Sequence, residues 1–420
     1  MANDVAAIDT ATVDPAAEAE PRVVFVLSKY SVGGLEKQLA NLIAHRPERA
    51  RHVEIHAITL QTPRSAEVQR RFEGAGVRTT LVNRDELGFP RFFLDLVRAM
   101  RRIRPAIVST LLDSSAGAWG RLAAWLTRVP VIVHSDRLLA TEGTRAHYAL
   151  RPFLDRVTDR FLPNAHAISE RLVASGVPRR KIRVMPNGVD LSVFDPGSAR
   201  DLRREWGVSE DATVAGYLGR IAPLKRVDLL LRAVQRLPEA SRPDVIVLAG
   251  DGPSLPQIHE LVSGDPWLER HTRFLGSIDD TPGFLASIDY LVLPSESEGL
   301  PNVVLEAMAM NRPVIATTVS DVPILVADTG LLVPPSDVAA LAEAIADMQQ
   351  RGHDLRRELG RRARQRIEDE YDIVQSAERF WDAHLELLGD GGATTVSGGP
   401  SASTEPTDGG PSGESDAGKP

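Results

Sequence analysis

Short apolar runs alternate with amphipathic segments along the first half of the chain. Residues 22–28 contain a continuous apolar run, which is typical of a strand buried on both faces of a parallel sheet. Residues 35–44 follow with apolar side chains at helical spacing. The same alternation predicts further strands at 53–60, 77–82, 106–110, 131–134 and 182–185, and helices at 64–75, 91–103, 117–126 and 165–176. Strands that alternate with helices predict a doubly wound α/β domain.

A second series of the same kind follows a turn-rich segment at residues 195–198. We therefore expect two α/β domains, 21–195 and 196–371, and a final helix at 372–388. The flanking tails, 1–20 and 389–420, lack core-forming residues and are expected to be disordered. In the second series, strands are predicted at 213–220, 245–249, 290–293 and 313–317, and long helical patterns at 341–359 and 362–388.

Composition narrows the class of protein. The chain has 420 residues, of which 43% are hydrophobic, enough for full cores. No apolar run approaches the roughly 20 residues that span a membrane, and the acidic, Ala-rich N-terminus lacks the features of a signal peptide. Because the chain has no cysteine, disulfides and thiolate metal sites are excluded. We expect a soluble cytoplasmic protein.

The net charge of −8 hides an asymmetry between the two halves. Residues 22–195 carry 28 Lys and Arg against 16 Asp and Glu, whereas residues 196–390 carry 20 against 32. A basic half indicates contact with something anionic. Nucleic acid is not expected as a partner, because aromatic residues make up only 5% of the chain and no basic run is interleaved with them.

The segment 294–309 carries the candidate chemistry. Pro301 disfavours helical geometry just before it, so that Glu298 should lie on a loop. Asn302 is a candidate N-cap for a helix that has Glu306 one turn in. Free backbone N–H groups at a helix start suit an anion, and two carboxylates can accept hydrogen bonds from neighbouring hydroxyls. A sugar nucleotide fits this chemistry, although two such carboxylates can also be a solvated loop residue and the partner of an arginine.

The whole segment resembles the Glu-x7-Glu motif of the retaining family 4 glycosyltransferases, including Glu-Gly-Leu-Pro-Asn at 298–302 and Glu-Ala-Met-Ala at 306–309. The resemblance extends over about residues 22–388. Further segments that resemble this family are Gly-Gly-Leu-Glu at 33–36, Pro-Asn-Gly-Val-Asp at 186–190, the Gly-Arg…Lys pattern at 219–225 and Arg-Phe-Leu-Gly-Ser at 273–277.

This resemblance implies a GT-B fold, in which two Rossmann-like domains face each other across a cleft and the final helix crosses back onto the first domain. It implies that a sugar moves from a nucleotide-diphosphate sugar to an acceptor with retention at the anomeric carbon. Arg220 and Lys225 would then clasp the diphosphate, Glu298 would contact the transferred sugar, and Glu306 would hold the ribose diol. The leaving diphosphate needs such cationic groups and helix N-termini. Other residues implied at the substrates are Gly33, Gly34, Gly299, Leu300, Pro301, Asn302, Asn187 and Gly276, with His134 or Arg137 beside the transferred sugar.

No metal or other cofactor is expected, because no Asp-x-Asp follows a strand and no His pair has ligand spacing. One departure from the family pattern is Ser-Asp-Val-Pro-Ile at 320–324, where Gly-Gly-x-Pro-Glu is common in a loop near the donor. Two alternatives remain. One is a GT-B epimerase or phosphorylase, and the other is a catalytically inactive sugar-nucleotide-binding protein.

The basic first domain bears on the acceptor, which this domain usually faces in GT-B enzymes. We expect a lipid-linked glycan or another glycoconjugate precursor of polysaccharide biosynthesis as the acceptor. The enzyme would then attach peripherally to an anionic membrane surface at the inner face of the cell membrane. A merely solvated basic surface is the alternative. The arginines concerned are Arg91, Arg98, Arg101, Arg102, Arg104, Arg145, Arg151 and Arg156.

Overall fold

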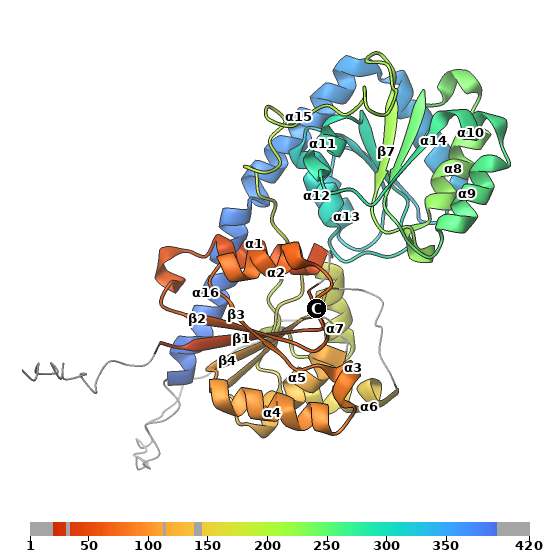
Figure 1. Ribbon diagram of the computed structural model, residues 1–420. Helices are drawn as coiled ribbons and strands as arrows, with labels where there is room; N and C mark the ends of the chain where they lie inside the picture. Colours follow the sequence, from red (N-terminus) through yellow and green to blue (C-terminus); the bar gives the residue numbers. More distant parts are fainter. Residues whose placement is uncertain (1–19, 31–33, 112–114, 138–144, 393–420) are drawn as a thin grey trace, which may run out of the picture.

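The computed structural model describes residues 20–30, 34–111, 115–137 and 145–392, without the side chains at 115, 145–148 and 390–392. Two lobes, each built around a six-stranded parallel sheet, lie one above the other (Figure 1). The predicted architecture of two facing Rossmann-like domains is therefore confirmed. Gly33 and most of both predicted tails lie outside the described residues.

The first sheet has the strand order β3-β2-β1-β4-β5-β6. Alternate residues of β1 pack on opposite faces: Val23 and Phe25 join one hydrophobic cluster, and Val24 and Val26 join the other. Both faces are covered by helices, which is why β1 is apolar throughout. The strands are β1 (Arg22–Leu27), β2 (Glu54–Thr59), β3 (Arg78–Leu81), β4 (Ile107–Leu111), β5 (Val131–Ser135) and β6 (Arg160–Phe161).

The second sheet has the strand order β12-β11-β10-β7-β8-β9. Its two central strands are β10 and β7, and β7 is the first strand of the second domain. The reversal of strand order beside β7 and β10 is the kind of place where open α/β sheets bind ligands. The strands are β7 (Val214–Leu218), β8 (Val245–Ala249), β9 (Thr272–Gly276), β10 (Tyr290–Leu293), β11 (Val314–Thr317) and β12 (Leu331–Val333).

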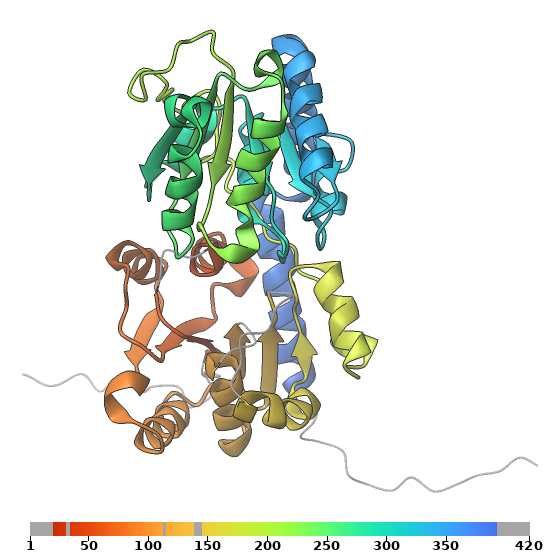
Figure 2. The ribbon, with the colours of Figure 1, turned by 90° about the vertical axis from the view of Figure 1, so that its right-hand side faces the viewer.

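Helices cover both faces of each sheet (Figures 1 and 2). On the first sheet, α1, α2 and α16 supply one cluster, and α4 and α5 supply the other. The first-domain helices are α1 (Gly34–Ala44), α2 (Ala66–Gly74), α3 (Arg84–Leu87), α4 (Arg91–Ile103), α5 (Ser115–Leu126), α6 (Arg145–Val157) and α7 (His166–Ala174). The later helices are α8 (Val227–Arg236), α9 (Leu255–Ser263), α10 (Pro266–His271), α11 (Thr281–Ala286), α12 (Asn302–Ala309), α13 (Val322–Val326), α14 (Val338–Gln350), α15 (Gly352–Glu370) and α16 (Ile373–Gly392).

The last helix returns to the first domain, as predicted. Trp381 is fully buried, and its Nε1–H donates to the carbonyl of Leu42 on α1 at 2.8 Å. Phe380 stacks on Phe25 of β1 with ring centroids 6.1 Å apart. In Figure 1 the helices α15 and α16 run from the upper lobe to the lower one. Helix α16 therefore completes the core of the first domain, although it runs to Gly392 and not to the predicted end at 388.

Two local predictions are wrong, and a third pattern is interrupted where the predicted final helix begins. Residues 182–185 form no strand, because Ile182 makes only an isolated bridge with Phe161. The helical pattern 341–359 is divided at Gly352, which has a φ of +66°. The pattern 362–388 is divided at residues 371–372, where the backbone pairs with Val189: the Val189 N–H donates to Tyr371 O at 2.8 Å, and the Ile373 N–H donates to Val189 O at 2.9 Å. This long-range pairing replaces the helical hydrogen bonds at the bend.

Candidate active site

A cavity of about 670 Å³ lies between the two domains. Its walls come largely from residues that follow the carboxyl ends of strands in both sheets, where open α/β sheets bind ligands. The first domain contributes α1 and the loops after β5 and β6. The second contributes the loops after β7, β8, β9 and β10 and the start of α12. The predicted site residues that line this cavity are Gly34, Arg137, Asn187, Arg220, Lys225, Glu298, Gly299, Leu300, Pro301, Asn302 and Glu306.

His134 and Gly276 are not among the lining residues. His134 lies on β5 with 2% of its surface exposed, and its Nδ1 is 2.8 Å from Thr110 Oγ1. Arg137 follows the end of the same strand and does line the cavity. Of the two residues considered for the position beside the transferred sugar, the structure thus brings Arg137 and not His134 to the cleft wall.

Lys225 and Glu298 form the central ion pair of the site. Lys225 ends a short 3-10 turn, Pro223–Lys225, after β7, and Glu298 lies on the loop after β10 as predicted. The Lys225 ammonium donates to both carboxylate oxygens of Glu298, at 2.6 and 2.7 Å. The Glu298 side chain is 8% exposed and that of Lys225 is 29% exposed. Residues far apart in sequence therefore place a cation and a carboxylate together at the floor of the cleft.

Arg220 supplies a second cation at the same wall. Its side chain is exposed, and its guanidinium forms no hydrogen bond or ion pair with the described part of the chain. Its backbone carbonyl accepts the hydroxyl hydrogen bond of Tyr217 at 2.9 Å. Burial, with a smaller contribution from the Glu298 charge, raises the pKa of Tyr217 well above its usual range, so that this hydroxyl remains protonated. The arrangement leaves the Arg220 side chain available to an anion.

Glu306 lies one turn into α12 and lines the cavity together with residues of α1. Enclosure by the cleft walls raises the pKa of its carboxyl to about 7, and the nearby Lys37 of α1 partly opposes this shift. Lys37 lines the same cavity. A carboxyl with a pKa raised to that value is protonated for part of the time at neutral pH, and hydroxyl donors would stabilise its charged form.

Asn302 does not cap α12, contrary to our prediction, because the helix already begins at this residue and Pro301 occupies the N-cap position. Its side chain bridges to the first domain. Asn302 Nδ2 donates to Gly34 O at 3.0 Å, and its Oδ1 accepts from Asn187 Nδ2 at 2.6 Å. Asn187 Oδ1 in turn accepts from Arg137 Nη1 at 2.9 Å. A chain of polar side chains therefore ties the loop before α12 to the first domain.

Two glycines let the domains approach closely at this point. A Cβ atom on Gly299 would lie 2.3 Å from the carbonyl oxygen of Arg137. A Cβ atom on Gly34 would lie 2.7 Å from Asn302 Nδ2. Arg137 itself is buried, which lowers its pKa to about 10 and still leaves it charged at neutral pH.

The segment 320–324, which differs from the family pattern, makes a second contact between the domains. The Asp321 carboxylate accepts from the backbone N–H groups of His166 and Ala167, at 2.5 and 2.9 Å. These N–H groups open helix α7, whose N-cap residue Ala165 supplies no side-chain hydrogen bond. Asp321 thus caps a helix of the other domain. This residue is not among those that line the central cavity.

Sequence reasoning missed several cleft residues, among them Lys37, Asn164 and Tyr217. Lys37 had a signal, because lysine is rare in this chain and this one follows the Gly-Gly-Leu-Glu segment. Tyr217 lies at the end of an apolar strand and reads as core. Asn164 carries no local signal, since only the tertiary structure brings the loop after β6 to the cleft.

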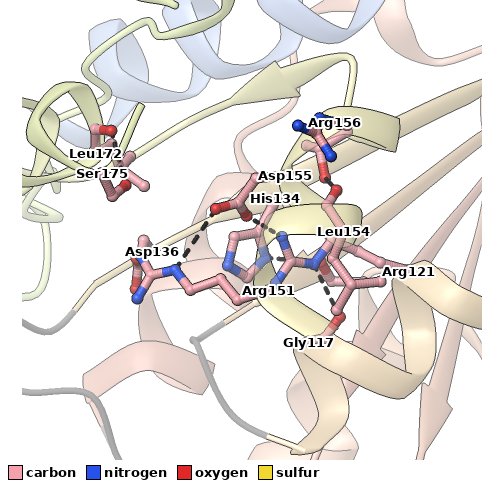
Figure 3. A network of polar contacts seen from close by, with 12 residues as sticks. Gly117, Arg121, His134, Asp136, Arg151, Leu154, Asp155, Arg156, Leu172 and Ser175 are labelled. Atoms are coloured by element: carbon pink, nitrogen blue, oxygen red, sulfur yellow. Dashed lines mark hydrogen bonds and ion pairs between the residues drawn. The ribbon is translucent and has the colours of Figure 1, made fainter. Parts of the chain in front are cut away.

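Arg151, one of the arginines of the predicted basic surface, belongs to an internal group of ion pairs. Arg121 donates to Asp155 at 3.0 Å, and Arg151 lies 3.5 Å from the same carboxylate. Figure 3 shows this group beside His134. Arg171, on α7, pairs with Asp136, which directly follows β5. Arg156 is exposed, whereas the side chain of Arg145 lies outside the described residues.

Within the described residues, no group of three or more His, Cys, Asp or Glu side chains could hold a metal ion. The expectation that no metal takes part stays a prediction. No helix in the described ranges is both long and apolar enough to cross a bilayer.

Each half of the chain matches a family of known proteins. Residues 32–193 match the family described as Glycosyltransferase Family 4. Residues 212–351 match the family described as Glycosyl transferases group 1. The two matches coincide with the two sheet-centred domains on either side of the cleft.

Relatives with known functions are also glycosyltransferases. The D-inositol 3-phosphate glycosyltransferase of Mycobacteroides abscessus is 34% identical over 248 residues, which are 54% of this chain and 55% of that protein. The match to this and similar relatives thus spans about half of their length. The UDP-Gal:alpha-D-GlcNAc-diphosphoundecaprenol alpha-1,3-galactosyltransferase of Escherichia coli is 27% identical over 308 residues, 70% of this chain and 79% of that protein.

Solved structures share the fold. Anabaena HepE in complex with UDP and glucose has a TM-score of 0.74 at 20% identity, covering 87% of this chain and 100% of that one. The sucrose-phosphate synthase of Thermosynechococcus elongatus has a TM-score of 0.70 at 20% identity, covering 88% of this chain and 100% of that one. The fold is therefore GT-B, as the sequence predicted. With both domains matched by family and the whole fold shared, the chain belongs to the family 4 glycosyltransferases.

Proposed function

We propose that this protein is a retaining glycosyltransferase that moves a sugar, of hexose type, from a nucleotide-diphosphate sugar to an acceptor hydroxyl. One observation carries the proposal. Two cations, Arg220 and Lys225, and two carboxylates, Glu298 and Glu306, line one cavity between the two domains. Cations there suit a diphosphate, and carboxylates suit the hydroxyls of ribose and of a sugar.

In this proposal the bond between the anomeric carbon and the diphosphate oxygen breaks, and its electron pair passes to the leaving diphosphate. Arg220 and Lys225 stabilise the charge that develops there. The acceptor oxygen forms the new bond to the anomeric carbon on the same face, and the acceptor proton goes to the departing phosphate. Glu306 holds the ribose diol near the N-terminal end of α12, and Glu298 orients the transferred sugar.

Before the donor binds, Lys225 and Glu298 neutralise each other as an ion pair. A phosphate oxygen near the Lys225 ammonium would compete with Glu298, and a sugar hydroxyl near Glu298 would compensate that carboxylate. Donor binding would thereby exchange one ion pair for two polar contacts with the substrate. Neither charge would be left buried without a partner, which would be costly at these exposures.

The comparisons suggest which donor to test first. The Escherichia coli relative is named for UDP-galactose and for a diphosphoundecaprenol-linked acceptor, and Anabaena HepE was solved with UDP and glucose. We therefore propose a UDP-sugar donor and a lipid-linked glycan acceptor. None of these relatives is named as an epimerase or a phosphorylase.

The test is a panel of sugar nucleotides assayed for slow donor hydrolysis without acceptor, in the wild type and in Lys225→Ala. We expect one class of donor to be hydrolysed and the variant to be much slower. Proton NMR of the first sugar product then reports its anomeric configuration, and inversion would contradict retention. A nucleotide sugar converted to an isomer would indicate an epimerase. Donor binding without acceptor-dependent nucleotide release would indicate an inactive binding protein.

Helix α4 supports the proposed membrane attachment. Its arginines Arg91, Arg98, Arg101 and Arg102 are exposed, and in the described part of the chain only Arg98 has an acidic partner, Asp95 at 2.7 Å. Apolar side chains accompany them: Phe89, just before the helix, is 60% exposed, and Leu94 is 51% exposed. Basic and large apolar side chains on one helical surface are typical of contact with an anionic membrane.

Sedimentation with liposomes tests this attachment. We expect binding to anionic liposomes at low salt, release at high salt, and no binding to neutral liposomes, because each exposed Arg near such a surface contributes about 1 kcal/mol. Arg101→Gln with Arg102→Gln should weaken binding. The matched control, Arg204→Gln with Arg236→Gln, removes the same charge from exposed sites of the second domain and should not. Protein that stays in the supernatant with anionic liposomes at low salt would contradict the attachment.

A further inference from the structure

A second and larger cavity, of about 820 Å³, lies at the opposite edge of the second sheet. Its floor is formed where strands begin: Thr213 precedes β7, Asp289 precedes β10 and Arg312 precedes β11. Helix α15 supplies another wall. Because all strands of this sheet are parallel, their first residues lie at the edge opposite to their carboxyl ends. This cavity, which we call the α15 cavity, is therefore separate from the cleft between the domains.

Arginines dominate the α15 cavity, but only some of them are neutralised. Arg203 donates to Asp289 at 2.8 Å and to three backbone carbonyls, and Asp289 also accepts from the Val214 N–H. Arg361 pairs with Glu358. The remaining three are Arg312, Arg356 and Arg357, and none of them pairs with a carboxylate of the described residues.

Two of these three arginines have a buried Nε–H without an acceptor in the described chain. Arg356 is 7% exposed, and its Nη1 donates to Met348 O at 3.1 Å, but its Nε has no partner in the described chain. Arg312 donates from Nη2 to Ala286 O at 2.8 Å, and its Nε is likewise buried without a partner. Buried donors of charged groups are normally paired, so each is an unusual feature of a folded protein.

Other arginines also add to the positive charge around Arg312. Burial lowers the pKa of Arg312, and although Asp289 and Asp201 oppose this shift, Arg203 and Arg357 add to it. Arg357 is exposed at the same wall and has no partner among the described residues. An oxyanion placed between Arg312, Arg356 and Arg357 would accept from the guanidinium Nη–H groups that make no hydrogen bond with the described chain. Guanidinium groups bind phosphate in this way, often through two parallel hydrogen bonds.

A phosphate alone does not account for the acidic side of the cavity. Asp201 and Asp211, from the segment that leads into β7, also line it. Carboxylates repel a bare anion but accept hydrogen bonds from hydroxyl groups. The cavity is also much larger than one phosphate. A molecule that carries a phosphate at one end and hydroxyls at the other would satisfy both walls.

We propose that the α15 cavity binds a phosphate ester of a small polyhydroxy compound, such as a sugar phosphate. Arg312, Arg356 and Arg357 bind its phosphate, and Asp201 and Asp211 accept hydrogen bonds from its hydroxyls. This site is independent of the donor site and does not depend on which sugar the enzyme transfers. Helix α15 leads into α16, which packs on the first domain, so the ligand lies against the element that joins the two domains (Figure 1).

Isothermal titration calorimetry on the full chain, at constant ionic strength, tests the proposal with inorganic phosphate, glucose and glucose 6-phosphate. We expect glucose 6-phosphate to bind more tightly than phosphate, and glucose not to bind measurably. Arg357→Gln should weaken the binding of glucose 6-phosphate by about tenfold or more, since it removes a charge-assisted hydrogen bond. Its side chain is exposed and unpaired, so this variant should fold. Arg312→Gln should act in the same direction.

Two controls locate the binding. Arg236→Gln removes an exposed arginine of the same domain that does not line the cavity, and it should leave affinity unchanged. Lys225→Met alters the cleft and should also leave it unchanged. The proposal is overturned if glucose 6-phosphate does not bind, if it binds no better than phosphate, or if Lys225→Met abolishes binding while Arg357→Gln does not.

Discussion

Replacing Lys225 by Met should cost more stability than replacing Glu298 by Gln, although both changes break the same ion pair. The reason is the unequal exposure of the two side chains, 29% for Lys225 and 8% for Glu298. Lys225→Met leaves a carboxylate that water hardly reaches. Glu298→Gln leaves an ammonium that water can solvate, and the Gln side chain can still accept one hydrogen bond from it.

The magnitudes follow from this difference. Removing one partner of a fully buried ion pair costs about 3–5 kcal/mol. Since Lys225 is partly exposed, we expect about 2–3 kcal/mol for Lys225→Met, and about 1 kcal/mol or less for Glu298→Gln, as for an exposed pair. In the double variant the stranded carboxylate is gone. It should therefore be more stable than Lys225→Met alone, with a coupling of more than about 1 kcal/mol between the two sites.

Urea unfolding of the four proteins at neutral pH, followed by circular dichroism, measures these free energies. In the proposed reaction, Lys225→Met should also lower kcat by about 10²–10³-fold, because it removes a charge that stabilises the leaving diphosphate. Equal costs for the two single variants, or purely additive effects in the double variant, would refute the reasoning from burial. A change in donor KM alone would refute the proposed catalytic role of Lys225.

Four further predictions concern the cleft and the contacts between the domains. Glu306→Ala should raise the donor KM with little change in kcat, because ribose binding is the same in the ground and transition states. The pKa of Glu306 is raised from 4.5 to about 7, so the folded state binds this proton more tightly than the unfolded state does. The resulting stabilisation, at most about 3 kcal/mol, should be lost as the pH rises from 4.5 to 7. Glu306→Gln should remove this pH dependence of the unfolding free energy measured in urea, and an unchanged dependence would contradict the raised pKa. Asp321→Ala should cost about 1–2 kcal/mol as the loss of a helix cap and speed amide hydrogen exchange at the start of α7, whereas protection that does not change would show that the carboxylate is not a cap. Gly299→Ala should lower kcat/KM at least about tenfold, because the added Cβ meets the Arg137 carbonyl. The control Gly74→Ala, whose Cβ meets nothing within 4 Å, should leave kcat/KM unchanged. Equal activities of the two variants would argue against close approach of the domains in catalysis.

Local sequence was enough to predict most of the fold. Strands buried on both faces must be apolar along their whole length, as in β1, and the helices between them must carry an apolar face. Backbone sterics at Pro301 were likewise sufficient to place Glu298 on a loop. The family motifs identified the cleft residues around Lys225, Glu298 and Glu306 because such motifs are contiguous segments.

Other features depended on contacts between distant residues, which local patterns do not contain. Asn302 has the composition of an N-cap, yet its amide bonds to Gly34 and Asn187, which are remote in sequence. The sequence separated a final helix at 372–388 from the domain before it, but the backbone pairing with Val189 that interrupts the pattern 362–388 there is visible only in the tertiary structure. The choice between His134 and Arg137 was decided by where β5 ends relative to the cleft. Each of these outcomes was decided by the tertiary structure, since a hydrogen bond depends on which groups meet in space and not on their neighbours in the chain.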